Sequence, residues 1–488
     1  MRGGRSAPAR PAAVSMITRR IAGGAVATAV QRHEVSMQET GGAGTFSGRV
    51  LVMFGTQVFG AAVGIVNGIL LARLLGPTGK GDYYILVLLP ATTMVLLQFG
   101  LPQAFGFFSA RGRTLGMIPK TLALTAALSA AASVLVLVLL PLLREAFLHE
   151  ISLDLILFAF LAFPLALHAT FTTAIVLGRQ AVGWYAAVNV SYPLVTTVLL
   201  VAILGGLGPS VAGAIAVNLM VSVIQALGFG LGAARVSRAV PWPGFASYRG
   251  LVRYGLRLYP GSLAGFFSYR IDVYLIAFLI TNPSEQLGFY SMAVGLAEMI
   301  FFFPLAVRTV FFPHVAGSSR EDSDRQVALV SRVTLLVSGV FALLLIPAAA
   351  IMIWTVLPAF GPSIPPLLVL LPGVVALSGG NVVGGYVSGI GRPGISSTVA
   401  VIAFVVNIAA NLVFIPRFGI IGAASASLLS YSLSSLLMTV IASRLSQTPL
   451  MGFWIPRLSD VRYVAATSAG LARRLRARIR ARPQRTQD

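Results

Sequence analysis

The chain has 488 residues, of which 57% are hydrophobic and only 10% are charged, and its mean hydropathy is +0.87. A soluble domain carries about 25% charged residues, so this composition excludes an ordinary soluble protein and indicates a polytopic membrane protein. The net charge of +22 comes mainly from arginines in short loops and two tails. No basic face is interleaved with aromatic residues, so nucleic acid is not expected as a partner.

Residue types that support common enzyme chemistry are scarce. Cysteine is absent, which excludes thiol catalysis, disulfides and thiolate metal sites. The four histidines form no ligand-spaced pair, so no metal site and no cofactor is expected. No GxxxxGK[ST] phosphate loop occurs, so no ATPase is built into the chain.

The first segment, residues 1–46, is rich in Gly, Ala, Arg and Ser and predicts a disordered basic cytoplasmic tail. Ile21–Val30 is too short and too weakly apolar for a signal peptide. Met16 and Met37 are alternative starts.

About twelve apolar segments follow, each long enough to cross a hydrocarbon layer of ~30 Å. We predict membrane spans near 49–73, 83–108, 116–142, 152–177, 182–204, 209–232, 253–280, 286–311, 327–356, 366–389, 395–416 and 420–443. The connections are short and leave no room for a soluble catalytic domain. Loop arginines gather on the side of the two tails, which predicts that both ends lie in the cytoplasm.

Three short motifs recur about 210 positions apart and indicate a duplicated unit. The pairs are Gly81-Asp82-Tyr83 with Gly288-Phe289-Tyr290, Gly178-Arg179 with Gly391-Arg392, and Gly213-Ala214 with Gly422-Ala423. Six spans per unit is an even number, so both units enter the membrane in the same direction. The predicted fold is all-α, with two six-helix lobes related by a pseudo-two-fold axis along the membrane normal.

The predicted boundaries follow from the spans. The N-terminal lobe covers 47–235, a cytoplasmic linker covers 236–252 and the C-terminal lobe covers 253–445. An Arg-rich cytoplasmic tail, 446–488, ends the chain. Its arginines, between 457 and 485, predict either a solvated tail or an anchor on anionic lipid.

Polar residues at membrane depth cost free energy and require a reason. Arg249, Arg253 and Arg257 are four residues apart and form one basic stripe if helical. The stripe either snorkels to inner-leaflet phosphates or attracts an anionic headgroup.

Arg270 lies near the midplane of the seventh span, and Asp272 points to nearly the opposite face of that helix. Glu298, in the eighth span, falls at a similar depth. Arg270 and Glu298 therefore either form an ion pair that fixes packing, or Arg270 contacts substrate phosphate. Asp272 or Glu298 is a candidate for binding H⁺ or Na⁺. The stripe Gly60, Gly64 and Gly68 in the first span predicts close helix packing.

The segment Leu71–Tyr83 resembles the end of the first helix and the first loop of the polysaccharide transporter family. This family comprises the oligosaccharide-lipid flippases of the multidrug/oligosaccharidyl-lipid/polysaccharide exporter superfamily. Matching positions are Tyr259-Pro260, Asp272, Gly288-Phe289-Tyr290, Pro304, Pro313 and Ile415–Ala424. The resemblance covers residues 47–445.

The resemblance implies a non-enzymatic flippase without catalytic residues. Such proteins move polyprenyl-diphosphate-linked oligosaccharide to the outer leaflet by alternating access, for O-antigen, exopolysaccharide or related export. Arg257 and Arg270, with Arg253, would neutralise the diphosphate, and amides such as Asn67 and Asn189 would line the sugar cavity or bind helices together. Asp272 and Glu298 would balance charge or sense a coupling ion.

The implied partners are lipid-linked oligosaccharide, membrane lipids, and a polysaccharide polymerase or glycosyltransferases. The alternatives on the same architecture are a multidrug/cation antiporter and a lipid II flippase. A membrane glycan polymerase or ligase fits the sequence less well, because no carboxylate pair lies on an outward-facing loop. A scaffolding membrane protein is a further alternative, which predicts that leucine can replace the midplane charges without effect.

Overall fold

The computed structural model describes residues 43–146, 148, 151–238, 244–317 and 319–462. The chain divides into two units after Gly55, and only the first turns of helix α2 are described in the first unit. The second unit, Thr56–Asp488, contains everything discussed below. Most of the predicted tail 1–46, the middle of the predicted linker and the arginines beyond residue 462 lie outside the described residues.

The described part of the chain is helical, and ten of its helices or helix pairs are long and apolar enough to cross a membrane. The elements are α2 (Ala43–Leu97), α3 (Leu101–Ala110), α4 (Met117–Ala146), α5 (Leu153–Phe160), α6 (Phe163–Gly178), α7 (Val182–Gly206), α8 (Val211–Arg238), α9 (Tyr248–Leu279), α10 (Pro283–Glu298), η1 (Met299–Phe301), α11 (Phe302–Gly317), α12 (Arg320–Val356), η2 (Pro358–Ser363), α13 (Ile364–Gly389), α14 (Pro393–Ser446) and α15 (Met451–Trp454).

Two of these helices are of double length, and each is broken at a glycine. Gly76 in α2 has φ 67° and ψ −176°, and Gly419 in α14 has φ 57° and ψ −135°. A side chain at such a φ would be strained, whereas glycine adopts it freely. A continuous helix of 55 residues would be about 80 Å long, far more than one crossing needs. Each broken helix therefore supplies two spans, and the twelve predicted spans are confirmed.

The predicted duplication is also present in the backbone. Six of the eleven left-handed residues in the described part of the chain form three pairs about 210 positions apart, and both members of each pair stand at the same place in the six-helix unit. The pairs are Gly76 with Asn282, Gln180 with Gly391, and Gly208 with Gly419. Both Gly76 and Asn282 are followed by a proline that begins the next helical segment. The same local backbone geometry is therefore used twice.

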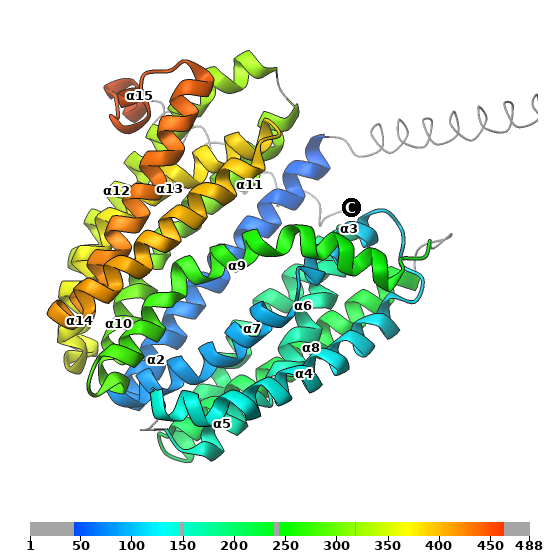
Figure 1. The fold of residues 1–488 in the computed structure, drawn as a ribbon, viewed down its shortest axis with the longest axis vertical. Coiled ribbons are helices and arrows are strands. Elements are labelled where there is room, and N and C mark those ends of the chain that lie inside the picture. Colours follow the sequence, from blue (N-terminus) through cyan, green and yellow to red (C-terminus); the bar gives the residue numbers. More distant parts are fainter. Residues whose placement is uncertain (1–42, 147, 149–150, 239–243, 318, 463–488) are drawn as a thin grey trace, which may run out of the picture. The chain divides into compact units, whose positions relative to one another are not determined.

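The helices form two lobes, each built around a central helix (Figure 1). In the first lobe, α6 packs against α3, α4, α7 and α8. In the second lobe, α13 packs against α10, α11, α12 and α14. The two central helices are the fourth and tenth spans, which are equivalent in the repeat. The all-α, two-lobed fold predicted from the sequence is confirmed.

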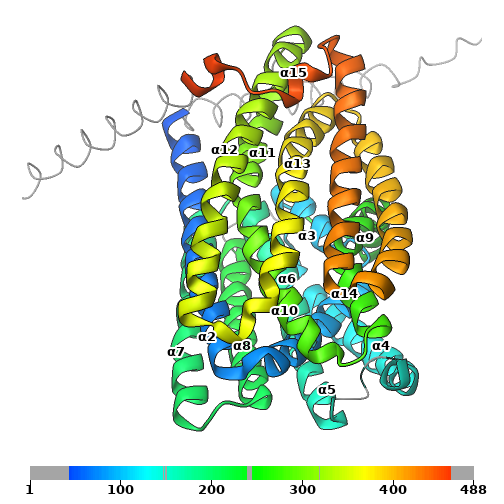
Figure 2. The same ribbon diagram turned by 90° about the vertical axis from the view of Figure 1, so that its left-hand side faces the viewer.

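The first part of the predicted C-terminal tail is folded. Figure 2 shows α15 and the residues around it crossing the end of the helix bundle. Phe453 of α15 is fully buried, and the Arg332 guanidinium binds both carboxylate oxygens of Asp460, at 2.8 and 3.3 Å. These hydrogen bonds from Arg332 hold the pKa of Asp460 below its ordinary value. Residues 447–462 are thus fixed to α12.

Candidate functional site

Helix α9 belongs to both lobes. Its first half packs on the first lobe: Tyr254 stacks on Phe107 with ring centroids 4.3 Å apart, and the Tyr259 hydroxyl donates to the Leu96 carbonyl at 2.7 Å. Its second half packs largely on the second lobe, where Tyr269 contacts Tyr431. Pro260 lies between the halves and removes a helical hydrogen bond. Helix α9 therefore contacts both lobes and has a break in its hydrogen bonding between the two contacts.

Arg270 lies on the second half of α9 and forms the predicted ion pair with Glu298. The Arg270 Nη1 and Nη2 atoms donate to the two Glu298 carboxylate oxygens at 2.9 and 3.4 Å. Nη1 also donates to the Tyr84 hydroxyl at 3.3 Å. The two charged side chains remain 26% and 34% exposed. The pair is therefore accessible to another charged group, unlike a pair sealed in a core.

Asp272 faces the opposite side of α9, as its spacing from Arg270 predicted, and is only 4% exposed. Its Oδ2 atom accepts hydrogen bonds from the Tyr290 hydroxyl and, at 3.4 Å, from the Ser427 hydroxyl. Its Oδ1 atom accepts from the Val273 amide at 2.9 Å. Within the described residues, Asp272 has no ion-pair partner. It is a buried carboxyl held by hydroxyl groups from α10 and α14.

Two buried amides extend this polar cluster into α14. Asn407 donates to the Ser430 hydroxyl at 3.0 Å, and Asn411 donates to the Asn407 side-chain oxygen at 3.0 Å. Both asparagines are at most 1% exposed. The Oδ1 atom of Asn411 has no hydrogen-bond partner in the structure. An unused buried acceptor is costly, because the amide oxygen loses water without gaining a donor.

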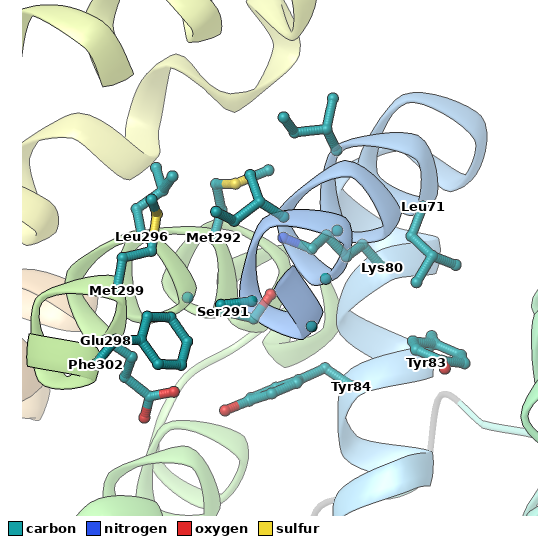
Figure 3. Close-up of a pocket in the computed structure, with 17 residues that line it drawn as sticks. Leu71, Lys80, Tyr83, Tyr84, Ser291, Met292, Leu296, Glu298, Met299 and Phe302 are labelled. Carbon is teal, nitrogen blue, oxygen red and sulfur yellow. The ribbon is translucent and has the colours of Figure 1, made fainter. Parts of the chain in front are cut away.

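A cavity of about 520 Å³ lies between the first half of α2 and the α10–α11 segment. Its walls are almost entirely apolar, and its lining includes Tyr84 and Glu298, the two groups that Arg270 contacts. Figure 3 shows Tyr84 and Glu298 at the same end of this cavity, with Lys80 elsewhere on its wall. The cavity thus combines a long apolar surface with one polar end.

The glycine stripe forms one wall of the cavity. The sequence predicted that Gly60, Gly64 and Gly68 serve close helix packing, and this prediction is wrong. A Cβ atom added at Gly64 or Gly68 would meet nothing within 4 Å, and at Gly60 it would meet only one backbone oxygen, at 4.0 Å. Gly295 on the opposite wall is equally open. The glycines create space instead of close contact.

The repeat glycines Gly81 and Gly288 mark a contact between the lobes. A Cβ at Gly81 would lie 1.7 Å from the Ser284 carbonyl oxygen, and a Cβ at Gly288 would lie 2.0 Å from the Pro77 carbonyl oxygen. The backbones of α2 and α10 therefore touch here, next to Lys80 on the cavity wall. Gly81 and Gly288 are equivalent positions in the duplication. The two repeated halves of the chain therefore meet through the same glycine motif.

A second contact between backbones, again at two glycines, joins the start of α3 to the first half of α9. A Cβ at Gly100 would lie 2.2 Å from the Gly255 carbonyl oxygen, and one at Gly255 would lie 2.5 Å from the Phe99 carbonyl oxygen. The span that begins after Gly76 thus touches the second half of the chain at two places, one on α10 and one on α9. The cavity lies mainly along the span before Gly76, and Lys80, Tyr83 and Tyr84 of the following span complete its lining.

The remaining predicted site residues lie away from the cavity. Arg253 and Arg257 are exposed on the first half of α9. Arg257 is separated from Arg270 by about 20 Å along the helix axis, so the two arginines form no single phosphate clamp here. Asn67 is buried and bonded to α7, through the Pro193 carbonyl and the Thr197 hydroxyl. Asn189 donates to a carbonyl of its own helix.

Among the described residues, no group of three or more His, Cys, Asp or Glu side chains could hold a metal ion. Of the features that line the cavity, sequence reasoning missed Tyr84 and the role of the glycine stripe. The four-residue spacing of the stripe was visible in the sequence. Whether such a stripe faces a helix or open space depends on the neighbouring span, which the sequence does not place.

Fold and site together define a multi-pass α-helical membrane protein whose two like-oriented lobes border an amphipathic cavity. The chain matches the family described as Polysaccharide biosynthesis protein over residues 49–319, and it belongs to that family. It is 24% identical over 398 residues to the probable low-salt glycan biosynthesis flippase Agl15 of Haloferax volcanii, covering 79% of this chain and 81% of the relative.

Two solved structures share the fold. One is an outward-facing multidrug resistance MATE family transporter of the MOP superfamily, with a TM-score of 0.59, 16% identity and coverage of 82% of this chain and 97% of that one. The other is the lipid II flippase MurJ in an inward closed conformation, with a TM-score of 0.61, 14% identity and coverage of 82% and 89%. At this identity the likeness concerns the fold.

Proposed function

We propose that this protein is a flippase that moves a polyprenyl-diphosphate-linked oligosaccharide across the membrane by alternating access, for surface glycan biosynthesis. The observation that carries the proposal is the cavity between α2 and α10–α11, whose lining is mostly apolar, with Tyr84 and Glu298 at one end and Lys80 on another part of the wall (Figure 3). A ligand that fits both parts has a hydrocarbon chain and a charged group. Family membership and the relative Agl15 support the same substrate class.

In this proposal the lipid chain lies against the glycine wall. Gly60, Gly64 and Gly68 present no side chain to the cavity, so an isoprenoid could slide along α2 without meeting fixed obstacles. Asn67 holds this segment against α7 through two hydrogen bonds, and Asn189 lies beside Gly60. We assign both asparagines the role of positioning the wall.

The diphosphate would contact Arg270 at the polar end. A guanidinium offers two parallel donors to a phosphate, and in the structure these donors point to Glu298. A multiply charged diphosphate would compete with the single carboxylate for them. Arg253 and Arg257, exposed on the approach along α9, would attract the headgroup before it reaches Arg270.

Substitution of Gly64 by leucine tests whether the cavity carries the lipid. We expect at least a tenfold slower transfer, because the side chain would occupy the cavity directly. The measurement uses proteoliposomes and a fluorescent polyprenyl-diphosphate oligosaccharide, whose exposure in each leaflet is read by a membrane-impermeant quencher.

The matched control is Gly339→Leu. Gly339 lies in α12, and a Cβ there also meets nothing within 4 Å, but it does not line the cavity. Equal transfer by wild-type liposomes and protein-free liposomes would contradict the proposal. Uptake of cationic drugs without lipid transfer would instead support an antiporter, and formation of glycosidic bonds by the purified protein would support an enzyme.

We further propose that Asp272 is the coupling group, binding H⁺ or Na⁺. Its support is a buried carboxyl that has no ion-pair partner among the described residues and lies within hydrogen-bond distance of the Tyr290 and Ser427 hydroxyl oxygens. Such oxygens suit a hard cation, and protonation would also remove the uncompensated charge. Glu298 is paired with Arg270, so we assign it the role of charge balance.

Asp272→Asn should make transfer independent of the coupling ion while preserving the shape of the side chain. We expect a wild-type rate that rises several-fold with an imposed proton or sodium gradient, and a variant rate that does not respond. Asp154→Asn, an exposed position in α5, removes the same charge as a control. A gradient response that survives in Asp272→Asn would remove Asp272 from coupling.

The orientation is part of the proposal. We propose that both termini are cytoplasmic and that the lobes cover 47–235 and 253–445. The arginine-rich loops on the side of α15 support this orientation. Because the chain has no cysteine, single introduced cysteines can be labelled with an impermeant thiol reagent to test it.

A further inference from the structure

A second cavity, of about 470 Å³, lies at the end of the bundle that carries α15, remote from the cavity of the proposed flippase site. It is bounded by the first third of α12 and by residues 448–457. Its basic lining residues are Arg325, Arg332 and Arg457, and its apolar lining residues are Ala328, Leu329, Pro449, Met451 and Ile455. Among the described residues, no acidic side chain lines it. The cavity is therefore both cationic and apolar.

The ordered C-terminal segment builds one wall of this second cavity. Arg332 donates to both oxygens of Asp460 and, at 2.5 Å, to the Gly452 carbonyl. The Arg457 amide donates to Asp460 as well, at 2.8 Å. Because all the Arg332 hydrogen bonds serve the scaffold, the side chains that can bind a ligand are Arg325 and Arg457, both exposed. Arg325 also pairs with Glu321 one turn earlier on α12, and this ion pair is open to solvent, with side chains 71% and 75% exposed, so a phosphate can compete for the guanidinium.

The depth of the second cavity follows from α12. Val333–Val356 contains no charged residue and is about 36 Å long as a helix, enough for a hydrocarbon core of ~30 Å. Arg332 stands at the end of this apolar stretch, and Arg325 lies about 10 Å beyond it along the axis. The second cavity thus lies at the level of lipid headgroups.

Large apolar side chains beside the second cavity are exposed. Met451 is 65% exposed, Ile455 57%, Leu458 82% and Val461 47%. Exposed apolar groups next to arginines are typical of segments that lie in a membrane interface. A soluble anion would use the arginines but not these side chains, whereas a phospholipid would use both.

We propose that the second cavity binds an anionic phospholipid, with its phosphate between Arg325 and Arg457 and its acyl chains along Met451 and Ile455. The site fixes the α12–α15 end of the second lobe to one membrane surface. It is independent of the proposed transport function, because neither arginine lines the other cavity.

The test uses the purified full chain in neutral detergent, with bound lipid counted by native mass spectrometry. The probes are short-chain phosphatidylglycerol, short-chain phosphatidylcholine and inorganic phosphate. We expect phosphatidylglycerol to bind at least tenfold more tightly than phosphatidylcholine, and inorganic phosphate to show no saturable binding at the same concentration. The double variant R325Q/R457Q should lose about tenfold in affinity for phosphatidylglycerol.

The control R238Q/R444Q removes two exposed arginines from the ends of α8 and α14 and should bind as the wild type does. Both double variants keep every arginine beyond residue 462, so those residues cannot explain a difference. Met451→Gln with Ile455→Gln should weaken lipid binding several-fold. Equal losses in the two arginine variants, equal binding of both lipids, or saturable phosphate binding would overturn the proposal.

Discussion

Replacing Arg270 by alanine is expected to slow lipid transfer strongly while the protein still inserts and folds. The guanidinium binds Glu298 and Tyr84 beside the first cavity. A charge-assisted hydrogen bond contributes about 1.5–3 kcal/mol, so loss of one such contact to diphosphate should slow transfer roughly 10- to 100-fold. Transfer would be measured in proteoliposomes at matched protein content.

A packing role and a substrate role for Arg270 give different results in a double variant. If the ion pair only fixes packing, removing both charges should largely restore function, because no unpaired charge remains. We expect R270A/E298A to stay inactive and E298A to keep part of its activity. The side chains are 26% and 34% exposed, so the stability cost should be well below the 3–5 kcal/mol of a fully buried broken pair. Recovery in the double variant would assign Arg270 to packing.

Substitution of Gly288 by valine should force the lobes apart where they cross. A Cβ at this position would lie 2.0 Å from the Pro77 carbonyl oxygen, and backbone cannot rotate away as a flexible side chain can. Overpacking typically costs about 1–3 kcal/mol. Because this contact lies next to Lys80 on the cavity wall, we expect the arrangement in which the two backbones touch to be depopulated and transfer to fall more than tenfold.

The change in conformation can be measured directly. Spin labels on cysteines introduced at Thr78 and Glu285, both exposed next to the crossing, should move apart in Gly288→Val. The control is Gly295→Ala, seven residues further along the same segment, where a Cβ meets nothing within 4 Å. An unchanged label distance in Gly288→Val, with normal transfer, would show that the crossing need not open.

The twelve spans could be predicted because each depends on local composition. A run of about 20 apolar residues must cross the membrane as a helix, whatever surrounds it. The duplication was readable for a similar reason: Gly81 and Gly288 recur because backbone contact requires a residue without a side chain. The contact between these two equivalent glycines could not be predicted, because a sequence repeat does not show where the symmetry axis between the two halves lies.

The site was only partly predictable. The Arg270–Glu298 pair could be expected, because two opposite charges at equal depth in neighbouring spans stabilise one another. The amides were less informative. The Asn67 side chain uses its amide in hydrogen bonds to α7, and nothing in its sequence spacing distinguishes such an amide from one that lines a cavity. The folding of residues 447–462 onto α12 depends on a pair between Arg332 and Asp460, 128 positions apart.

The sequence alone determined what each segment is: an apolar helix, a repeated unit, a charge at mid-membrane. These properties follow from the free-energy cost of placing polar groups in hydrocarbon, because each residue contributes to that cost separately. Only the tertiary structure decided which surfaces face one another. It placed the glycine stripe on a cavity, divided α9 between two lobes and gave Arg270 its partners, because helix faces are chosen by side-chain packing between spans far apart in the chain.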